Sequence, residues 1–316
     1  MNSEVVNTSV MIYPGGRWIQ RSGKGLSDFG LKQINDPHLA EIYFYPYAKE
    51  LFPGADISDG ISIVIKNYKK TESGFIYHYC EPGKPITTVT LDSPGDKIIP
   101  LDPRDLLISN KIDSFVENNN LSFMHDRILP RTLFGIESDF VSKNKDRVSE
   151  YNEGDIIDFT QQIKLYTNDK AGKTGRTKWF VADKSVIQNN KEYLDKWKVI
   201  VSSANAGGIK RDNQLEIIDN HSAFGRSRVA LAAFDTKEEA ENFYKYVSSD
   251  VIKYCFLLID EALTTLGMKV PDMGSYSTDN SLIDYSKDVD LQLVKIMKLS
   301  TEEYEYIKNI VKTHRG

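Results

Sequence analysis

The stretch Tyr45–Ile65, YPYAKELFPGADISDGISIVI, contains the clearest structural signal in this chain. Within it, Phe52-Pro53-Gly54 predicts a turn that carries a bulky aromatic side chain. A polar loop at residues 56–60 follows, and the largely apolar run at residues 61–65 predicts a buried strand. A buried strand needs partner strands, and the flanking sequence supplies candidates for them.

Further elements of both kinds flank this strand, which is the pattern of a mixed α/β sheet. The segment at residues 69–74 is hairpin-like, so we expect the strands on its two sides to form an antiparallel pair. A Pro- and Gly-rich segment at residues 81–103 then breaks the pattern. The expected elements are strands at Val5–Ile12, Leu39–Tyr45 and Phe75–Tyr79, and helices at Leu26–Ile34 and Asp105–Asn118.

The second half of the chain has a different pattern, so we expect one domain at residues 1–120 and another at residues 121–316. Short β-prone pieces between polar loops come first, at Lys178–Val181, Lys198–Ser202 and Ser227–Phe234. Helices follow, two of them opened by the capping-box pairs Thr236 with Glu239 and Ser300 with Glu303. An apolar helix is expected at Val251–Leu266.

The bulk composition excludes several classes of protein. A net charge of −5 argues against a protein that coats nucleic acid without specificity. No apolar window approaches the length of a membrane span, so no membrane partner is expected. Cys80 and Cys255 lie far apart, which favours a reducing, cytoplasmic location over a disulfide framework. The five histidines show no metal-ligand spacing, so no metal site is expected.

The segment at residues 164–184 interleaves basic and aromatic residues. Its cations outnumber its two acidic residues, and Gly172 and Gly175 favour a flexible loop that could follow phosphates. The alternative is a solvated, Lys-rich hairpin loop that binds nothing. A phosphate-binding P-loop is rejected because Thr167 stands where that motif needs glycine. The candidate DNA contacts are Lys170, Lys173, Arg176, Lys178 and Trp179.

The stretch at residues 202–228 is small and polar, and it carries the residue types that read base edges. Arg or Lys pairs with guanine, whereas Asn or Gln pairs with adenine. The alternative is a hydrogen-bonded loop cluster that shapes the domain and contacts no ligand. The candidate readers are Asn205, Lys210, Arg211, Asn213, Gln214, His221, Arg226 and Arg228.

Three pieces of this sequence resemble the adenine-specific DNA methyltransferases of restriction–modification systems. They are Met11-Ile12-Tyr13-Pro14, the Phe52 turn with Asp56–Ile61, and the helix that starts at Thr236. The resemblance extends from about Met11 to Val311 and covers only the later part of a complete enzyme. It implies the trailing part of a methyltransferase-like mixed α/β sheet, followed by an α+β target-recognition domain with carboxy-terminal helices.

Single residues take roles from this resemblance. Phe52 is expected to stack on the target adenine after the base is flipped out of the duplex, and the alternative is a core aromatic beside a turn. Arg17 and Trp18, in a loop that varies within the family, are expected DNA contacts. Asp59 stands where many relatives carry glycine, which alters the expected approach to the backbone.

The same family needs a Gly-rich S-adenosylmethionine turn and an Asn/Asp-Pro-Pro-aromatic loop, and neither occurs in this sequence. We therefore expect no catalytic residue and no cofactor in this chain alone, with S-adenosylmethionine bound by the complete enzyme. The expected partners are double-stranded DNA and, if the chain is a split subunit, a chain that carries the amino-terminal methyltransferase half.

The predicted function is sequence-specific DNA binding as the recognition part of an adenine-N6 DNA methyltransferase. The alternative is a non-catalytic interaction subunit that completes or regulates a partner methylase or nuclease. An open sheet edge would favour that alternative, because unpaired strand edges invite a second chain.

Overall fold

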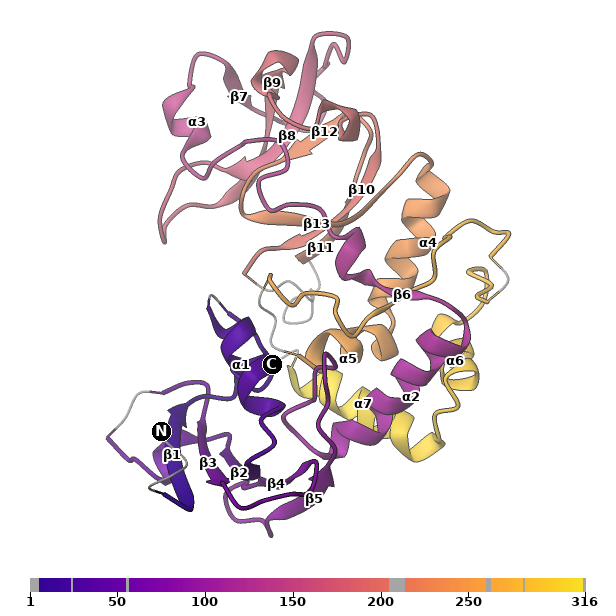
Figure 1. Cartoon of the computed structure of the whole chain (residues 1–316). Coiled ribbons are helices and arrows are strands. Elements are labelled where there is room, and N and C mark those ends of the chain that lie inside the picture. Colours follow the sequence, from indigo (N-terminus) through magenta and orange to yellow (C-terminus); the bar gives the residue numbers. More distant parts are fainter. Residues whose placement is uncertain are drawn as a thin grey trace. The chain divides into compact units, whose positions relative to one another are not determined.

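Figure 1 shows the computed structural model of the chain, which describes residues 6–23, 25–54, 57–204, 214–259, 263–280 and 282–314. Two compact units divide the chain. The first comprises Met1–Asp113 and Leu258–Thr265, and the second comprises Ser114–Leu257 and Leu266–Gly316. Each unit contains helix and a sheet that mixes parallel with antiparallel pairs, so the predicted α/β class is confirmed.

The first unit is built on a five-stranded sheet in the order β1-β3-β2-β4-β5. In this sheet β1, β2 and β4 run in one direction, and β3 and β5 run against them. The run at residues 61–65 lies in β3, between two partner strands. The elements are β1 Thr8–Pro14, α1 Leu26–Ile34, β2 Leu39–Tyr45, η1 Ala48–Glu50, β3 Ile61–Asn67, β4 Phe75–Tyr79, β5 Thr87–Leu91 and α2 Arg104–Asn118, whose last residues belong to the second unit.

The predicted antiparallel pairing of the strands that flank residues 69–74 is wrong. Instead, β2 lies between β3 and β4 and pairs with β4 in parallel. The buried strand β3 uses β1 and β2 as its two partners, which leaves no free edge for β4. Strand β5 lies inside the Pro- and Gly-rich segment and was not predicted. Its local sequence is rich in threonine and does not stand out as a strand among the surrounding Pro and Gly residues.

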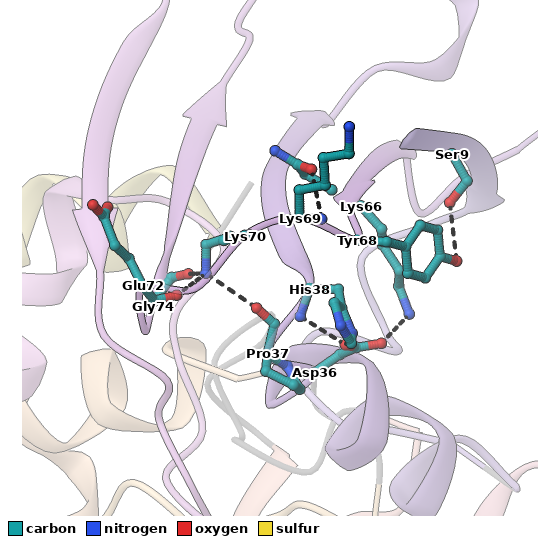
Figure 2. A network of polar contacts seen from close by, with 11 residues as sticks. Ser9, Asp36, Pro37, His38, Lys66, Tyr68, Lys69, Lys70, Glu72 and Gly74 are labelled. Atoms are coloured by element: carbon teal, nitrogen blue, oxygen red, sulfur yellow. Dashed lines mark hydrogen bonds and ion pairs between the residues drawn. The ribbon is translucent and has the colours of Figure 1, made fainter. Parts of the chain in front are cut away.

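A polar network fixes the connection from β3 to β4 (Figure 2). The Asp36 carboxylate accepts a hydrogen bond from Lys66 Nζ at 2.5 Å. Burial by itself raises the pKa of Asp36, but hydrogen bonds, that from Lys66 foremost, outweigh it and lower the pKa overall. Lys70 Nζ donates to the carbonyl oxygens of Pro37 at 3.3 Å and Gly74 at 2.6 Å. The connection from β3 to β4 is therefore hydrogen-bonded to the turn that joins α1 to β2.

Trp18 belongs to the core of the first unit. Its side chain is only 2% exposed, and its indole N–H donates to Ser62 Oγ at 2.7 Å. The rings of Tyr13 and Phe29 lie edge-on to it, with centroids at 5.6 and 6.3 Å. The prediction that Trp18 contacts DNA is wrong, because the ring is buried and its polar group is already satisfied.

The described residues of the second unit form three sheets, in the orders β11-β10-β13, β12-β8-β9-β7 and β14-β6. Its strands are β6 Ser122–Phe123, β7 Val148–Glu150, β8 Gln162–Asn168, β9 Thr177–Asp183, β10 Trp197–Ser202, β11 Leu215–Ile218, β12 Ser222–Phe224, β13 Arg228–Phe234 and β14 Pro271–Asp272. Its helices, besides the end of α2, are α3 Phe140–Lys143, α4 Lys237–Ser248, α5 Asp250–Leu257, α6 Val289–Ile296 and α7 Thr301–His314, with short 3₁₀ turns η2 Met124–Arg127, η3 Lys184–Val186 and η4 Lys191–Tyr193.

Both predicted capping boxes start helices. The Glu239 N–H donates to Thr236 Oγ1 at 3.2 Å, and the Glu303 N–H donates to Ser300 Oγ at 3.1 Å. The helix predicted at Val251–Leu266 is too long, since α5 ends at Leu257. Apolar residues beyond its end, such as Leu266, are buried in irregular structure, so hydrophobicity alone overstates the helix.

Two kinds of site are absent from the described ranges. No group of three His, Cys, Asp or Glu side chains in these ranges is arranged to hold a metal ion. No helix in the same ranges is long and apolar enough to cross a membrane.

Candidate nucleic-acid interface

The hairpin of β8 and β9 carries the basic segment of the second unit. In β8 the side chains alternate between the buried core, at Ile163 and Leu165, and a more open face, at Lys164 and Tyr166. Trp179 of β9 lies opposite Tyr166 in the antiparallel register. Between Lys164 and Asp183, only residues 169–176 lie outside the two strands. The segment at residues 164–184 is therefore a hairpin with a short loop, not one long flexible loop.

The hairpin loop is a closed turn that presents three cations. Its ends are joined by hydrogen bonds at 2.9 Å from the Asp169 N–H to the Arg176 carbonyl and from the Arg176 N–H to the Asp169 carboxylate. Gly175 packs so tightly that a Cβ would lie 2.1 Å from the Lys170 carbonyl oxygen. Within the described ranges, Lys170, Lys173 and Arg176 form no ion pair, so their charges remain available to an anion.

Stacked rings and cations support this hairpin from β13 and β11. The Arg228 guanidinium lies 4.9 Å from the Tyr166 ring centroid, and Arg228 Nη2 donates to the Tyr166 hydroxyl at 2.9 Å. Tyr166 stacks on Trp179 at 4.7 Å, and the Lys164 ammonium lies 5.7 Å from the Trp179 ring. The Tyr166 hydroxyl donates to Glu216 Oε1 at 2.9 Å. We call Arg228, Tyr166, Trp179 and Lys164 the aromatic–cation ladder, and it stiffens the hairpin that carries the loop.

Burial and ion pairing decide which ladder groups can reach a ligand. Arg228 is only 8% exposed and pairs with Glu216 at 3.8 Å, and Lys164 pairs with Asp219 at 2.5 Å. Burial raises the pKa of Tyr166, which keeps its hydroxyl protonated and able to donate. In this arrangement Arg228 positions Tyr166, and it would reach a base only by breaking these contacts.

Lys178 and Arg226 form ion pairs on the surface of the second unit. Lys178 Nζ lies 2.8 Å from Glu150, and Arg226 Nη1 lies 2.7 Å from Glu137. All four side chains are exposed, and ion pairs of this kind contribute only about 0–1 kcal/mol. Both cations can therefore exchange a carboxylate for a phosphate or a base edge at little cost.

The remaining predicted readers follow β10 or precede β12. The His221 ring stacks on the Phe159 ring, with centroids 4.5 Å apart, and the backbone N–H of His221 donates to the Asp219 carboxylate. His221 therefore belongs to a packed turn. Gln214 lies directly before β11. Four predicted readers fall outside the described residues, namely Asn205, Lys210, Arg211 and Asn213.

In the first unit, β1, β2 and β4 run in the same direction, so their carboxyl ends lie at the same end of the sheet. Ligands of α/β sheets usually bind beyond the carboxyl ends of such strands. Phe52 lies on the connection after β2 and is 43% exposed. Arg17, after β1, pairs with Asp59 at 3.0 Å. The Gly15 N–H donates to the Gly60 carbonyl at 2.7 Å, which joins the two turns. Asp59 thus anchors Arg17 beside the Phe52 connection.

Tyr166 is central to the ladder, and Glu216 accepts the hydrogen bond of its hydroxyl, yet neither is among the site residues predicted from the sequence. The polar alternation of Gln162–Asn168 is a signal that would have placed Tyr166 on the open face of a strand. Glu216 has no such local signal, because its contact with Tyr166 depends on how strands distant in sequence come together.

The sequence matches no protein-family model and no curated protein. Among solved structures, the chain is similar to the type IIG restriction endonuclease BpuSI, at 8% sequence identity and a TM-score of 0.29. The similarity covers 98% of this chain and 46% of that enzyme, so this chain spans less than half of the enzyme's length. At this identity and TM-score the likeness assigns neither a family, nor an activity, nor a site to this chain.

Proposed function

We propose that the chain binds a specific duplex DNA site as the recognition part of an adenine-N6 DNA methyltransferase of a restriction–modification system. The observation that carries this proposal is the closed loop at residues 169–176, which presents three exposed cations that form no ion pair with any described residue. Cations held at fixed positions can contact neighbouring phosphates, and each contact releases counterions. Exposed Arg226 would then read base edges, together with the predicted readers Asn205, Lys210, Arg211, Asn213 and Gln214.

Charge reversal of the loop should flatten the salt dependence of DNA binding. The double variant Lys170→Glu, Lys173→Glu removes two phosphate contacts, so the slope of log K against log [salt] should fall by roughly 2. The matched control, Lys145→Glu with Lys312→Glu, makes the same change of net charge at exposed lysines elsewhere. Fluorescence anisotropy of a labelled random duplex at several salt concentrations measures both. Equal slopes for the two double variants would rule the loop out as the phosphate contact.

In the same proposal, Phe52 receives the flipped adenine. An exposed aromatic face replaces the stacking that a flipped base loses, and such contacts contribute about 1–3 kcal/mol per base. Phe52→Ala should therefore weaken binding to a duplex with one unpaired adenine about tenfold or more, and weaken binding to the fully paired duplex by less, because the cost of unpairing the adenine offsets part of the stacking there. Tyr47→Ala, at another exposed aromatic on the same connection, is the control. An equal loss in both variants would contradict a specific role for Phe52.

The proposal also assigns the cofactor and the other half of the enzyme. S-adenosylmethionine, the methyl donor, would be bound by the complete enzyme and not by this chain alone, which has no Gly-rich cofactor turn. A partner chain would carry the methyltransferase half with its Pro-Pro-aromatic loop. The first unit would then complete a methyltransferase-like sheet, and the second unit would recognise the DNA site.

One observation favours the second candidate function, a non-catalytic interaction subunit. Strand β1 is an edge of the first unit's sheet, and no strand among the described residues pairs with its outer side. An edge of this kind binds a further strand through main-chain hydrogen bonds. If the chain showed no salt-dependent DNA binding but still bound another chain through β1, the interaction subunit would be the better description of its function.

A further inference from the structure

The outer side of β1 presents unused backbone groups. The Tyr68 N–H donates to the Asn7 carbonyl at 2.9 Å, and the Gly15 N–H donates to the Gly60 carbonyl at 2.7 Å. Backbone groups in an antiparallel pair alternate, so the odd-numbered residues of β1 point their N–H and C=O groups toward β3. The even-numbered residues Thr8, Val10 and Ile12 therefore point theirs away from the sheet.

Two of these outward-facing residues, Val10 and Ile12, also expose apolar side chains. Val10 is 62% exposed and Ile12 is 56% exposed. They lie in register with Ile65 and Ile63 of β3, so an apolar row continues across two strands of this face. The strand Thr8–Pro14 contains no charged residue, although charges are the usual protection of a sheet edge. The opposite edge, β5, presents exposed threonines instead.

We propose that two copies of this chain pair through the outer sides of their β1 strands. The strands would run antiparallel about a two-fold axis at Met11, which forms one continuous sheet from both copies. This register places Val10 of each copy opposite Ile12 of the other, so outward-pointing backbone groups meet and can exchange both of their hydrogen bonds. Pro14, which has no N–H, comes opposite Thr8 and marks the end of the pairing.

The pattern of the strand favours a second copy as the occupant. Two-fold pairing brings Val10 opposite Ile12 and Met11 opposite Met11 at the centre of β1, and no like charges face one another along the strand. It also places the four exposed aliphatic side chains of Val10 and Ile12 from both copies side by side, where each covers part of the next. The inference does not depend on DNA being the ligand of the second unit.

Charge-swapped variants test this pairing in the full chain. Analytical ultracentrifugation of the wild-type protein over a range of concentrations should detect a dimer. The Val10→Lys, Ile12→Lys variant and the Val10→Glu, Ile12→Glu variant should each dimerise about tenfold more weakly or worse, because like charges then face one another. An equal mixture of the two should recover a heterodimer, because each lysine then faces a glutamate. Thr90→Lys, at an exposed position on β5, should leave the wild-type dimer unchanged.

Two outcomes would overturn the proposal. A wild-type chain that stays monomeric at the highest concentration excludes self-pairing and leaves the edge to a different chain. A lysine double variant that dimerises as tightly as the wild type places the dimer contact elsewhere. Circular dichroism of each variant checks the fold, and recovery in the mixture separates lost pairing from lost folding. Anisotropy with labelled DNA on the same samples reports the proposed function independently.

Discussion

Gly225→Ala should lower the free energy of unfolding by about 3 kcal/mol, the upper part of the range for overpacked cores. A Cβ at this position would lie 2.0 Å from Thr167 Oγ1 and 2.8 Å from Thr167 Cβ. Thr167 is buried near the carboxyl end of β8, and its branched side chain has few rotamers with which to move away. The Gly225 N–H also donates to the Tyr166 carbonyl at 3.0 Å, so the strain reaches the aromatic–cation ladder.

Urea denaturation followed by circular dichroism measures this loss. The control is Gly54→Ala, because a Cβ on Gly54 would meet nothing within 4 Å, and its stability should stay close to wild type. If Gly225→Ala were as stable as Gly54→Ala, the close approach of β8 to the turn before β13 would be incorrect.

Lys198→Met should lower the free energy of unfolding by about 2 kcal/mol at neutral pH. Lys198 is fully buried in β10, and its Nζ donates to the carbonyl oxygens of Tyr193 at 2.9 Å, Leu194 at 3.0 Å and Lys196 at 2.6 Å. Methionine fills a similar volume but leaves these acceptors without a donor, at a cost of about 1–3 kcal/mol for a buried group. Relief from burying an amine offsets part of that loss.

The difference in stability between wild type and Lys198→Met should also depend on pH. Burial lowers the pKa of Lys198 to about 7, below the ordinary value of 10.5. Between these two values the unfolded chain holds a proton on Lys198 that the folded chain releases, so the contribution of Lys198 to stability rises with pH. Urea denaturation at pH 7 and pH 9 should show a larger deficit for the variant at pH 9. A deficit that is independent of pH would contradict the lowered pKa.

Local signals in the sequence predicted many of the elements of this fold. The β-branched and aromatic residues of Leu39–Tyr45 specify β2, and the helix at Arg104–Asn118 differs from its prediction by one residue. The capping boxes located the starts of α4 and α7, since each is a hydrogen-bonded arrangement of neighbouring residues. The prediction of strand order was wrong, because the position of β2 between β3 and β4 is decided by packing over the whole sheet.

The sequence predicted where the charged residues of the candidate site lie along the chain. It did not predict which residues they contact in the fold. A composition signal identified Lys170 and Lys173, which lie exposed on the loop, but composition does not report burial. Arg228 and Trp18 have the chemistry of nucleic-acid contacts, yet both lie in the interior with partners from distant strands. Which cations remain unpaired is a property of the folded surface, and only the structure separates Lys170 from Arg228.

Selection from a pool of randomised duplexes tests sequence-specific DNA recognition most directly. The purified chain is incubated with the pool at moderate salt, the retained duplexes are amplified over several rounds, and the final pool is sequenced. We expect enrichment of one short motif, whose binding survives an excess of unrelated duplex. A pool that stays random, or retention of no DNA even at low salt, would contradict it.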